Sequence, residues 1–243
     1  MRSRKNPTLP HLSLILPVYN EPHRLQAGLK LAVNYLKKQS YSWEVIVVDD
    51  GSTDTSTSNW WSGISRNSPE VKLIRTARNF GKGHAIRLGV AVGRGDYIIF
   101  SDIDFSVAIT YLPQFLSALK KSDMAIGSRR LSASRITQHQ PLLREYLGRG
   151  FTQLSNWILG LNHSDLTCGF KAFRSKPAKD LFSHQQLNRW AFDAEILFLA
   201  KKFHYRVTEI PVTWHNNPFT KVNLFKDTIT SLISLAQIRL IHL

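Results

Sequence analysis

The chain has 243 residues, of which 43% are hydrophobic and 20% are charged, a composition typical of a globular protein rather than a disordered or fibrous one. Its 32 Lys and Arg residues against 17 Asp and Glu residues give a formal net charge of +15, which indicates an anionic partner or surface. The single cysteine, Cys168, excludes disulfides within the chain, and no apolar run reaches the roughly 20 residues that a membrane-spanning helix needs.

The first half of the chain alternates short apolar runs with segments of helical spacing. Strands are predicted at 12–19, 43–48, 71–75, 96–100 and 124–126, and helices at 22–36, 83–93 and 112–119, with a polar helix ending near residue 67. Strands that alternate with helices predict an α/β fold, with a mostly parallel sheet flanked by helices on both faces. Such sheets bind ligands at the carboxyl ends of their strands.

The second half of the chain is less regular. Helices are predicted at 144–161, 190–203 and 224–240, and strands at 169–173 and 206–212. Residues 128–140 are polar and basic without periodicity, and we expect a mobile loop there. No internal repeat or linker interrupts the sequence, so we expect a single domain over residues 1–243.

Carboxylates follow two of the predicted strands. Asp102 and Asp104 stand two residues apart, so in an extended segment both side chains would face one ligand. Their oxygens suit Mg²⁺ or Mn²⁺ bridged to a diphosphate, although Asp-x-Asp is also common in solvated turns. After another strand, Asp50 either accepts hydrogen bonds from a base or ribose or belongs to a plain turn that caps the next helix.

Basic residues gather in two other segments. Residues 78–83 place Lys82 and two glycines before a helix, which suits a phosphate but is also consistent with an ordinary helix-entry turn. A cluster of arginines follows later, and arginine binds phosphate through two parallel hydrogen bonds, although an ordinary basic surface is the alternative. The clustered residues are Arg129, Arg130, Arg135, Arg144 and Arg149.

Eight short segments occur in a characteristic order. They are LPVYNE at 16–21, VVDDGSTD at 47–54, NFGKG at 79–83, SDID at 101–104, GSR at 127–129, DLTCGFK at 165–171, RWAFDAE at 189–195 and VTEIPVTW at 207–214. Together they resemble glycosyltransferase family 2, and within it the dolichyl-phosphate and polyprenyl-phosphate hexose synthases, in particular the dolichyl-phosphate glucosyltransferase branch. The resemblance extends over residues 11–225 and implies the GT-A fold, a Rossmann-like fold that binds nucleotide-diphosphate sugars.

The resemblance implies a donor site in residues 11–127. It assigns to the nucleotide sugar the residues Pro17, Tyr19, Glu21, Asp50, Lys82 and Asp102 and, from outside this half, Lys221. Asp102 and Asp104 would act in catalysis by holding Mg²⁺ or Mn²⁺ and the diphosphate. The expected donor is a hexose nucleotide, with UDP-glucose preferred and GDP-mannose as the alternative.

The resemblance also implies an acceptor site in residues 128–222, for a polyprenyl or dolichyl phosphate. Arg129 and Arg144 would grip the acceptor phosphate, and Asp165 and Asp193 match catalytic acidic positions near the reaction centre. Metal and cations would neutralise the departing diphosphate, and the acceptor phosphate is already anionic near pH 7, so it needs positioning more than a base. The expected reaction is an inverting transfer that yields a β-linked lipid phosphate.

A lipid acceptor also accounts for the basic charge, because anionic headgroups attract Lys and Arg. We expect peripheral association with the cytoplasmic face of a membrane. The helix at 146–161 and the amphipathic C-terminal helix at 223–243 either lie on the membrane or pack on the sheet. The sequence does not indicate an oligomeric state.

Two other functions stay open. An enzyme that uses a saccharide or glycan hydroxyl as acceptor would need a base, for which Asp165 is the candidate. A basic nucleic-acid-binding module is a more distant alternative, because the sequence has no zinc-finger spacing and no aromatic RNA-binding motif.

Overall fold

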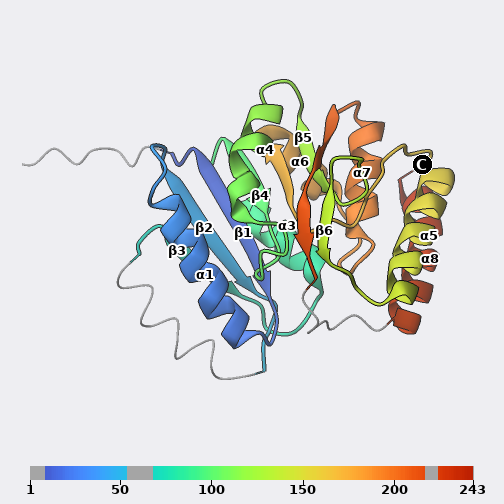
Figure 1. Ribbon diagram of the computed structural model, residues 1–243, viewed down its shortest axis with the longest axis horizontal. Helices are drawn as coiled ribbons and strands as arrows, with labels where there is room; N and C mark the ends of the chain where they lie inside the picture. Colours follow the sequence, from blue (N-terminus) through green and yellow to red (C-terminus); the bar gives the residue numbers. More distant parts are fainter. Residues whose placement is uncertain (1–8, 54–67, 217–223, 243) are drawn as a thin grey trace, which may run out of the picture.

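A seven-stranded sheet forms the centre of the molecule (Figure 1). The computed structural model describes residues 9–53, 68–216 and 224–242, with the side chains of all but 224–229. The strand order is β3-β2-β1-β4-β7-β5-β8, and within this sheet β7 alone runs antiparallel to its neighbours. The strands are β1 (Leu12–Val18), β2 (Trp43–Asp49), β3 (Val71–Arg75), β4 (Tyr97–Phe100), β5 (Met124–Ser128), β7 (Lys171–Arg174) and β8 (Val207–Pro211). The predicted mostly parallel α/β sheet is confirmed.

Helices cover both faces of this sheet, and successive residues of β1 therefore pack on opposite sides. Leu14 and Leu16 belong to the core with α1 and α4, whereas Ile15 belongs to the core with α3, α6 and α7. The helices are α1 (Pro22–Leu36), α3 (Lys82–Val92), α4 (Leu112–Ala118), α5 (Leu142–Leu159), α6 (Ser175–His184), α7 (Phe192–Lys202) and α8 (Leu224–Ile241), with a 3₁₀ turn at Ile109–Tyr111. In Figure 1, α5 and α8 lie together at one end of the molecule, beyond α7.

Most predicted strands and helices are present with slightly shifted ends, but α6 was not predicted. This helix has ten residues and buries Pro177, Ala178, Leu181 and Phe182 at helical spacing, so the signal was present in the sequence but was missed. The polar helix predicted to end near residue 67 falls on residues 54–67, outside the described residues.

The prediction of a mobile loop over residues 128–140 was wrong in part, because these residues contain strand β6 (Arg135–Gln138). It pairs in parallel with β9 (Thr213–His215) in a separate two-stranded sheet. The Tyr111 hydroxyl supports β9 by donating to Thr213 Oγ1 at 3.0 Å and accepting from Thr213 N at 2.8 Å. No local periodicity marks β6, because it is largely exposed and its partner strand lies far along the chain.

The C-terminal helix α8 carries apolar residues on more than one side. Leu235 and Ile238 are buried in the core, and the helix packs against α5 and α7, whereas Ile233 and Leu240 are exposed. None of the helices that the structure describes is long and apolar enough to cross a membrane.

Candidate active site

The predicted donor residues gather at the carboxyl ends of three adjacent strands. Because β1 lies between β2 and β4, the segments that follow these strands meet at one edge of the sheet. Pro17 lies near the end of β1, Tyr19 and Glu21 follow it, Asp50 follows β2, and Asp102 follows β4. The topology therefore brings together these five residues, which are far apart in sequence.

Asp50 shapes the loop that precedes Lys82. Its Oδ1 accepts a hydrogen bond from Phe80 N at 3.0 Å, and its Oδ2 accepts one from Gly81 N at 2.7 Å. Gly81 has φ 115°, and a Cβ at this position would come within 2.5 Å of Asn188 O, so the turn needs glycine. Asp50 is buried. A base or ribose could therefore bind only to the lone pairs of its carboxylate that are not already used by the N–H groups of this loop.

Asp102 and Asp104 stand on a tight turn after β4. Phe105 has φ 47° and donates its N–H to Asp102 O, which reverses the chain directly after the two carboxylates. Asp104 Oδ1 accepts hydrogen bonds from Ser106 N at 3.1 Å and from Ser106 Oγ at 2.9 Å, which orient its side chain. Gly169 lies against the other carboxylate, since a Cβ there would overlap Asp102 Oδ2.

Lys82 brings a positive charge to these carboxylates. Its Nζ lies 2.6 Å from Asp102 Oδ1, and 16% of its side chain is exposed. Burial alone would lower the pKa of Lys82, but the charges of Asp102, Asp193 and Asp104 outweigh burial and raise this pKa. Lys82 therefore stays protonated and can pair with a carboxylate or with a donor phosphate. Lys221, predicted to meet the same donor phosphate, lies outside the described residues.

We call Asp50, Asp102 and Asp104 the acidic edge. Asp102 and Asp104 are suited to binding a divalent metal ion. The side chain of Asp102 is 42% exposed and that of Asp104 is 15% exposed, so a ligand can reach both. In the described part of the chain, no group of three or more His, Cys, Asp or Glu side chains could hold a metal ion by itself. Mg²⁺ is usually held by one or two carboxylates together with substrate phosphates and water, which matches two aspartates beside a diphosphate.

Asp165 and Arg129 form a buried ion pair. Arg129 donates from Nε to Asp165 Oδ2 at 2.6 Å and from Nη2 to Oδ1 at 2.9 Å, and its backbone N–H adds a third bond at 3.1 Å. Burial alone would raise the pKa of Asp165, but the charge of Arg129 outweighs burial and holds this pKa well below its usual range. Asp165 is thus suited to positioning Arg129, and it is poorly suited to taking a proton from a hydroxyl acceptor.

Asp193, in the first turn of α7, is paired with a lysine that the sequence analysis missed. Lys171 Nζ lies 2.5 Å from Asp193 Oδ1 and donates to Cys168 O at 2.7 Å, and both charged side chains are buried. Burial raises the pKa of Asp193 against the opposing charges of Lys171 and Lys82. The available signal was a lysine in an apolar strand, since a fully buried lysine needs a partner. The negative charge of Asp193 also raises the pKa of Lys82, which is the lysine that pairs with Asp102 at the acidic edge.

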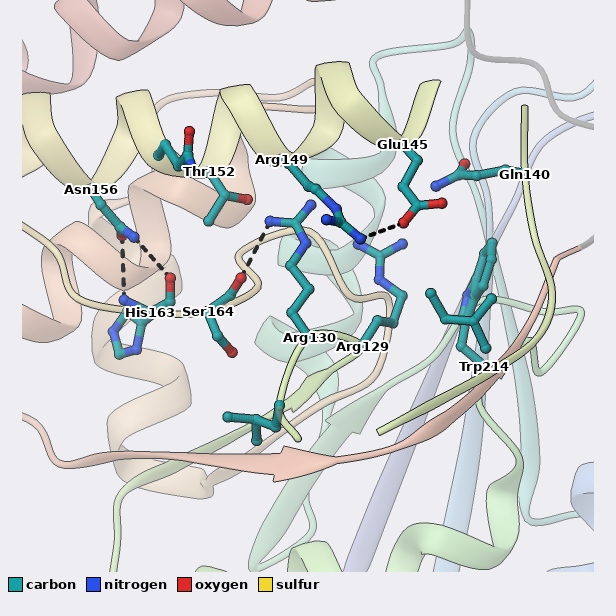
Figure 2. A pocket seen from close by; sticks show the side chains of 13 residues that line it. Arg129, Arg130, Gln140, Glu145, Arg149, Thr152, Asn156, His163, Ser164 and Trp214 are labelled. Atoms are coloured by element: carbon teal, nitrogen blue, oxygen red, sulfur yellow. Dashed lines mark hydrogen bonds and ion pairs between the residues drawn. The ribbon is translucent and has the colours of Figure 1, made fainter. Parts of the chain in front are cut away.

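A cavity of about 490 Å³ lies beside α5, and we call it the arginine pocket (Figure 2). Its walls come from α5, from β6 and from the loops at 129–131 and 163–164, with Trp214 of β9 closing one side. The Arg129 guanidinium lies over the ring of Trp214, 5.4 Å from its centroid. Arg129 therefore connects the buried ion pair to the wall of this pocket.

Two further arginines point into the arginine pocket. Figure 2 shows Arg130 reaching up between Ser164 and Arg149, and Arg130 Nη1 donates to Ser164 O at 3.2 Å. Arg149 donates from Nη2 to Glu145 Oε1 at 2.6 Å, one helical turn away on α5. The sequence showed these arginines as part of a cluster, but it did not indicate which of them share a cavity.

The two arginines predicted for the acceptor phosphate occupy different places. Arg129 lines the arginine pocket, whereas Arg144 is half-buried on α5 outside its lining. The pKa of Arg144 is lowered by burial and by the charge of Arg129, so the two cations lie within electrostatic reach. The segment from Asp165 to Gly169 joins the arginine pocket to the acidic edge, because one end binds Arg129 and the other contacts Asp102.

Known proteins resemble this chain in sequence. The family described as Glycosyl transferase family 2 matches residues 13–182. A protein named dolichyl-phosphate beta-glucosyltransferase from Dictyostelium discoideum is 31% identical over 96% of this chain and 75% of its own length. The protein of the same name from Homo sapiens is 34% identical over 84% of this chain and 67% of its own length.

Solved structures resemble it in fold. Glucosyl-3-phosphoglycerate synthase from Mycobacterium tuberculosis in complex with UDP superposes with a TM-score of 0.67 at 14% identity, covering 94% of this chain and 80% of that one. The same enzyme with Mn²⁺, UDP-glucose and phosphoglyceric acid gives a TM-score of 0.65 at 16% identity over the same shares. S. aureus TarS 1–349 with UDP-GlcNAc gives 0.57 at 18% identity, covering 93% of this chain and 66% of that one. At these identities the likeness concerns the fold alone.

Proposed function

The chain belongs to glycosyl transferase family 2, and we propose that it transfers glucose from UDP-glucose to dolichyl phosphate or a related polyprenyl phosphate. The names of the relatives at 31% and 34% identity support the sugar and the acceptor, and the UDP complexes of proteins with this fold support the nucleotide. The observation that carries the proposal is the acidic edge with Lys82, joined through residues 165–169 to the arginine pocket.

On the donor side, the loops after β1 and β2 would bind the nucleotide through Pro17, Tyr19, Glu21 and Asp50. Asp102 and Asp104 would hold Mg²⁺ or Mn²⁺, which when bound neutralises charge on the departing diphosphate. Lys82 lies beside Asp102 and offers a second positive charge, as Lys221 is proposed to do. Charges placed before the reaction begins favour the transition state, because no reorganisation is needed as the leaving group becomes more anionic.

On the acceptor side, Arg144 would hold the acceptor phosphate together with Nη1 of Arg129, which donates no hydrogen bond to the described residues. An oxygen of this phosphate attacks the anomeric carbon from the face opposite the diphosphate, so the C–O bond to the diphosphate breaks and the configuration inverts. The attacking oxygen is already anionic, so no base is required. This agrees with Asp165 and Asp193, which are committed to Arg129 and Lys171 and would act in catalysis by positioning these cations.

We also propose that the protein binds the cytoplasmic face of a membrane through α5 and α8. Among the described residues, twelve large apolar side chains are exposed, and eight of them lie on these two helices. They are Leu142, Leu143, Tyr146, Trp157, Leu232, Ile233, Leu240 and Ile241. Exposed apolar residues on a chain of net charge +15 are suited to a surface of anionic lipids.

The membrane proposal is tested by sedimentation with vesicles. Replacing Leu142, Leu143 and Tyr146 together with Ser should reduce binding to vesicles that contain anionic phospholipid, with no loss of folding because all three side chains are exposed. The triple replacement of Leu9, Leu31 and Val92, which are exposed elsewhere, is the matched control. Equal binding of both variants would overturn the assignment of this face.

The catalytic proposal is tested by the mass of the product. The protein with Mg²⁺ and a short-chain polyprenyl phosphate would be incubated with UDP-glucose and, separately, with GDP-mannose. A lipid phosphate that gains one hexose from UDP-glucose is the expected result, and transfer from GDP-mannose alone would correct the donor. Hydrolysis of the donor without lipid product would discard the acceptor, and transfer to a saccharide hydroxyl would favour the alternative enzyme.

A further inference from the structure

Arg130 differs from the other arginines that line the arginine pocket. Arg129 and Arg149 are each paired with a carboxylate, whereas the hydrogen bond of the Arg130 guanidinium goes to the backbone carbonyl of Ser164. Among the described residues no carboxylate oxygen lies within the 4.0 Å of an ion pair with Arg130. A cation inside a cavity, with no charged partner of its own, is available to an anionic ligand.

The arginine pocket also holds positive charges close together. The pKa of Arg130 is lowered mainly by burial, and the like charges of Arg129 and Arg149 lower it further, against the opposing charges of Asp165 and Glu145. Guanidinium groups that repel one another in a partly desolvated cavity are stabilised by an anion placed between them. Glu145, the carboxylate in the lining, forms an ion pair with Arg149, and among the described residues it forms none with Arg130.

The lining also includes three apolar side chains among its polar ones. Leu131, Ile136 and Trp214 face the same cavity as Arg130. Its volume of about 490 Å³ lies within the range of roughly 300–1,000 Å³ typical of small-molecule sites and exceeds the size of a phosphate group. The pocket therefore suits an amphiphilic phosphate, with an anionic head beside the arginines and a hydrocarbon chain beside the three apolar side chains.

We infer that Arg130 binds the phosphate of the lipid acceptor in the arginine pocket, and that the first isoprene units of the acceptor lie against Leu131, Ile136 and Trp214. The inference rests on the proposed function. It adds a residue that binds the acceptor phosphate and a position for the isoprenoid tail of the acceptor. Arg130 joins Arg129 at the phosphate, and Arg144 lies outside the pocket lining but within electrostatic reach of Arg129. Because Asp165 clamps Arg129 and Glu145 pairs with Arg149, Arg130 is the arginine of the lining that has no carboxylate partner among the described residues.

The test is binding, measured apart from turnover. The full chain would be titrated calorimetrically with a short-chain polyprenyl phosphate, with the corresponding polyprenyl alcohol, and with UDP and Mg²⁺. Arg130→Ala should weaken binding of the lipid phosphate roughly 10- to 100-fold, the loss expected for hydrogen bonds between charged groups. Binding of the alcohol and of UDP should not change. Arg135→Ala is the matched control, because it removes the same charge from an exposed position outside the pocket lining.

Equal effects of Arg130→Ala and Arg135→Ala, or no effect of either, would overturn the inference. If Arg130→Ala fails to fold, Arg130→Lys and Arg130→Gln serve instead, since Lys keeps the charge and Gln keeps a donor for Ser164. Lys should then bind the lipid phosphate more tightly than Gln, and equal affinity would overturn the inference. Binding that depends on Arg130 without glucose transfer would overturn the proposed function alone. Glucose transfer by a variant of unchanged acceptor affinity would overturn the inference alone.

Discussion

The acidic edge and the arginine pocket differ in how completely their charged side chains are paired. At the acidic edge, the carboxylates of Asp50 and Asp104 accept hydrogen bonds from backbone N–H groups, and Asp102 is paired with Lys82. In the arginine pocket, positive charges outnumber the carboxylates that neutralise them, and Arg130 is paired with none among the described residues.

The acidic edge is therefore ordered before a ligand binds, whereas the charges of the arginine pocket are balanced only when an anion binds. Carboxylates held by their own loops have fixed positions, as a metal and a diphosphate require for precise placement. An arginine that lines a cavity without a carboxylate partner, as Arg130 does among the described residues, is stabilised when an anion binds. We therefore expect changes at the acidic edge to reduce turnover, and changes in the arginine pocket to affect acceptor affinity, except where they break the buried ion pair.

The largest expected effect is on stability, through that ion pair. Asp165→Asn leaves the Arg129 guanidinium without its counter-charge and should lower the free energy of unfolding by about 3–5 kcal/mol, as measured by urea denaturation. Asp96→Asn, at a side chain that is 69% exposed, is the control and should change it little.

The pH dependence of this effect has a definite sign. The pKa of Asp165 is held below its usual value in the folded protein, so its contribution is complete above the unfolded value of about 3.9 and is lost as the pH falls through the folded value. The stability difference between the protein and Asp165→Asn should therefore shrink on acidification. A difference that grows towards acid pH would contradict the role of the ion pair.

The next effect is on turnover at the acidic edge. Asp104→Asn should lower kcat for transfer roughly 10²- to 10³-fold, the loss typical of removing one preorganised electrostatic contact. It should also weaken Mn²⁺ binding in the presence of UDP. Folding should persist, because the Asn amide oxygen can still accept hydrogen bonds from Ser106. Ser106→Ala is the control for the orientation of this side chain, and full activity of Asp104→Asn would refute the metal assignment.

The smallest expected effect separates the two sites. Arg144→Ala should raise KM for the polyprenyl phosphate about tenfold and leave KM for UDP-glucose unchanged, because one cation at the edge of the acceptor site is lost. Initial rates at varied acceptor and donor concentrations measure both constants, with Arg135→Ala as the control. A parallel rise in both constants would show that Arg144 serves the whole fold rather than the acceptor.

The sequence alone determined the parts of this protein that depend on local pattern. Apolar runs between helical segments specify a mostly parallel sheet, and such a sheet brings residues that follow its strands to one edge. The positions of Asp50, Asp102 and Asp104 follow from that rule, and the resemblance of the short motifs supplied their roles. The position of Lys82 at the start of α3 also follows from local pattern.

Only the tertiary structure decided the pairings between distant segments. Asp165 meets Arg129 across 36 positions, Lys171 meets Asp193 across 22, and β6 finds its partner in β9. No local periodicity encodes such contacts, because they depend on how elements pack once the sheet has formed. Through these pairings Asp165, predicted to be catalytic, holds Arg129 in place, and Arg130 forms no ion pair with a carboxylate of the described residues. The sequence specified which charges are present, and folding determined which of them remain available to a ligand.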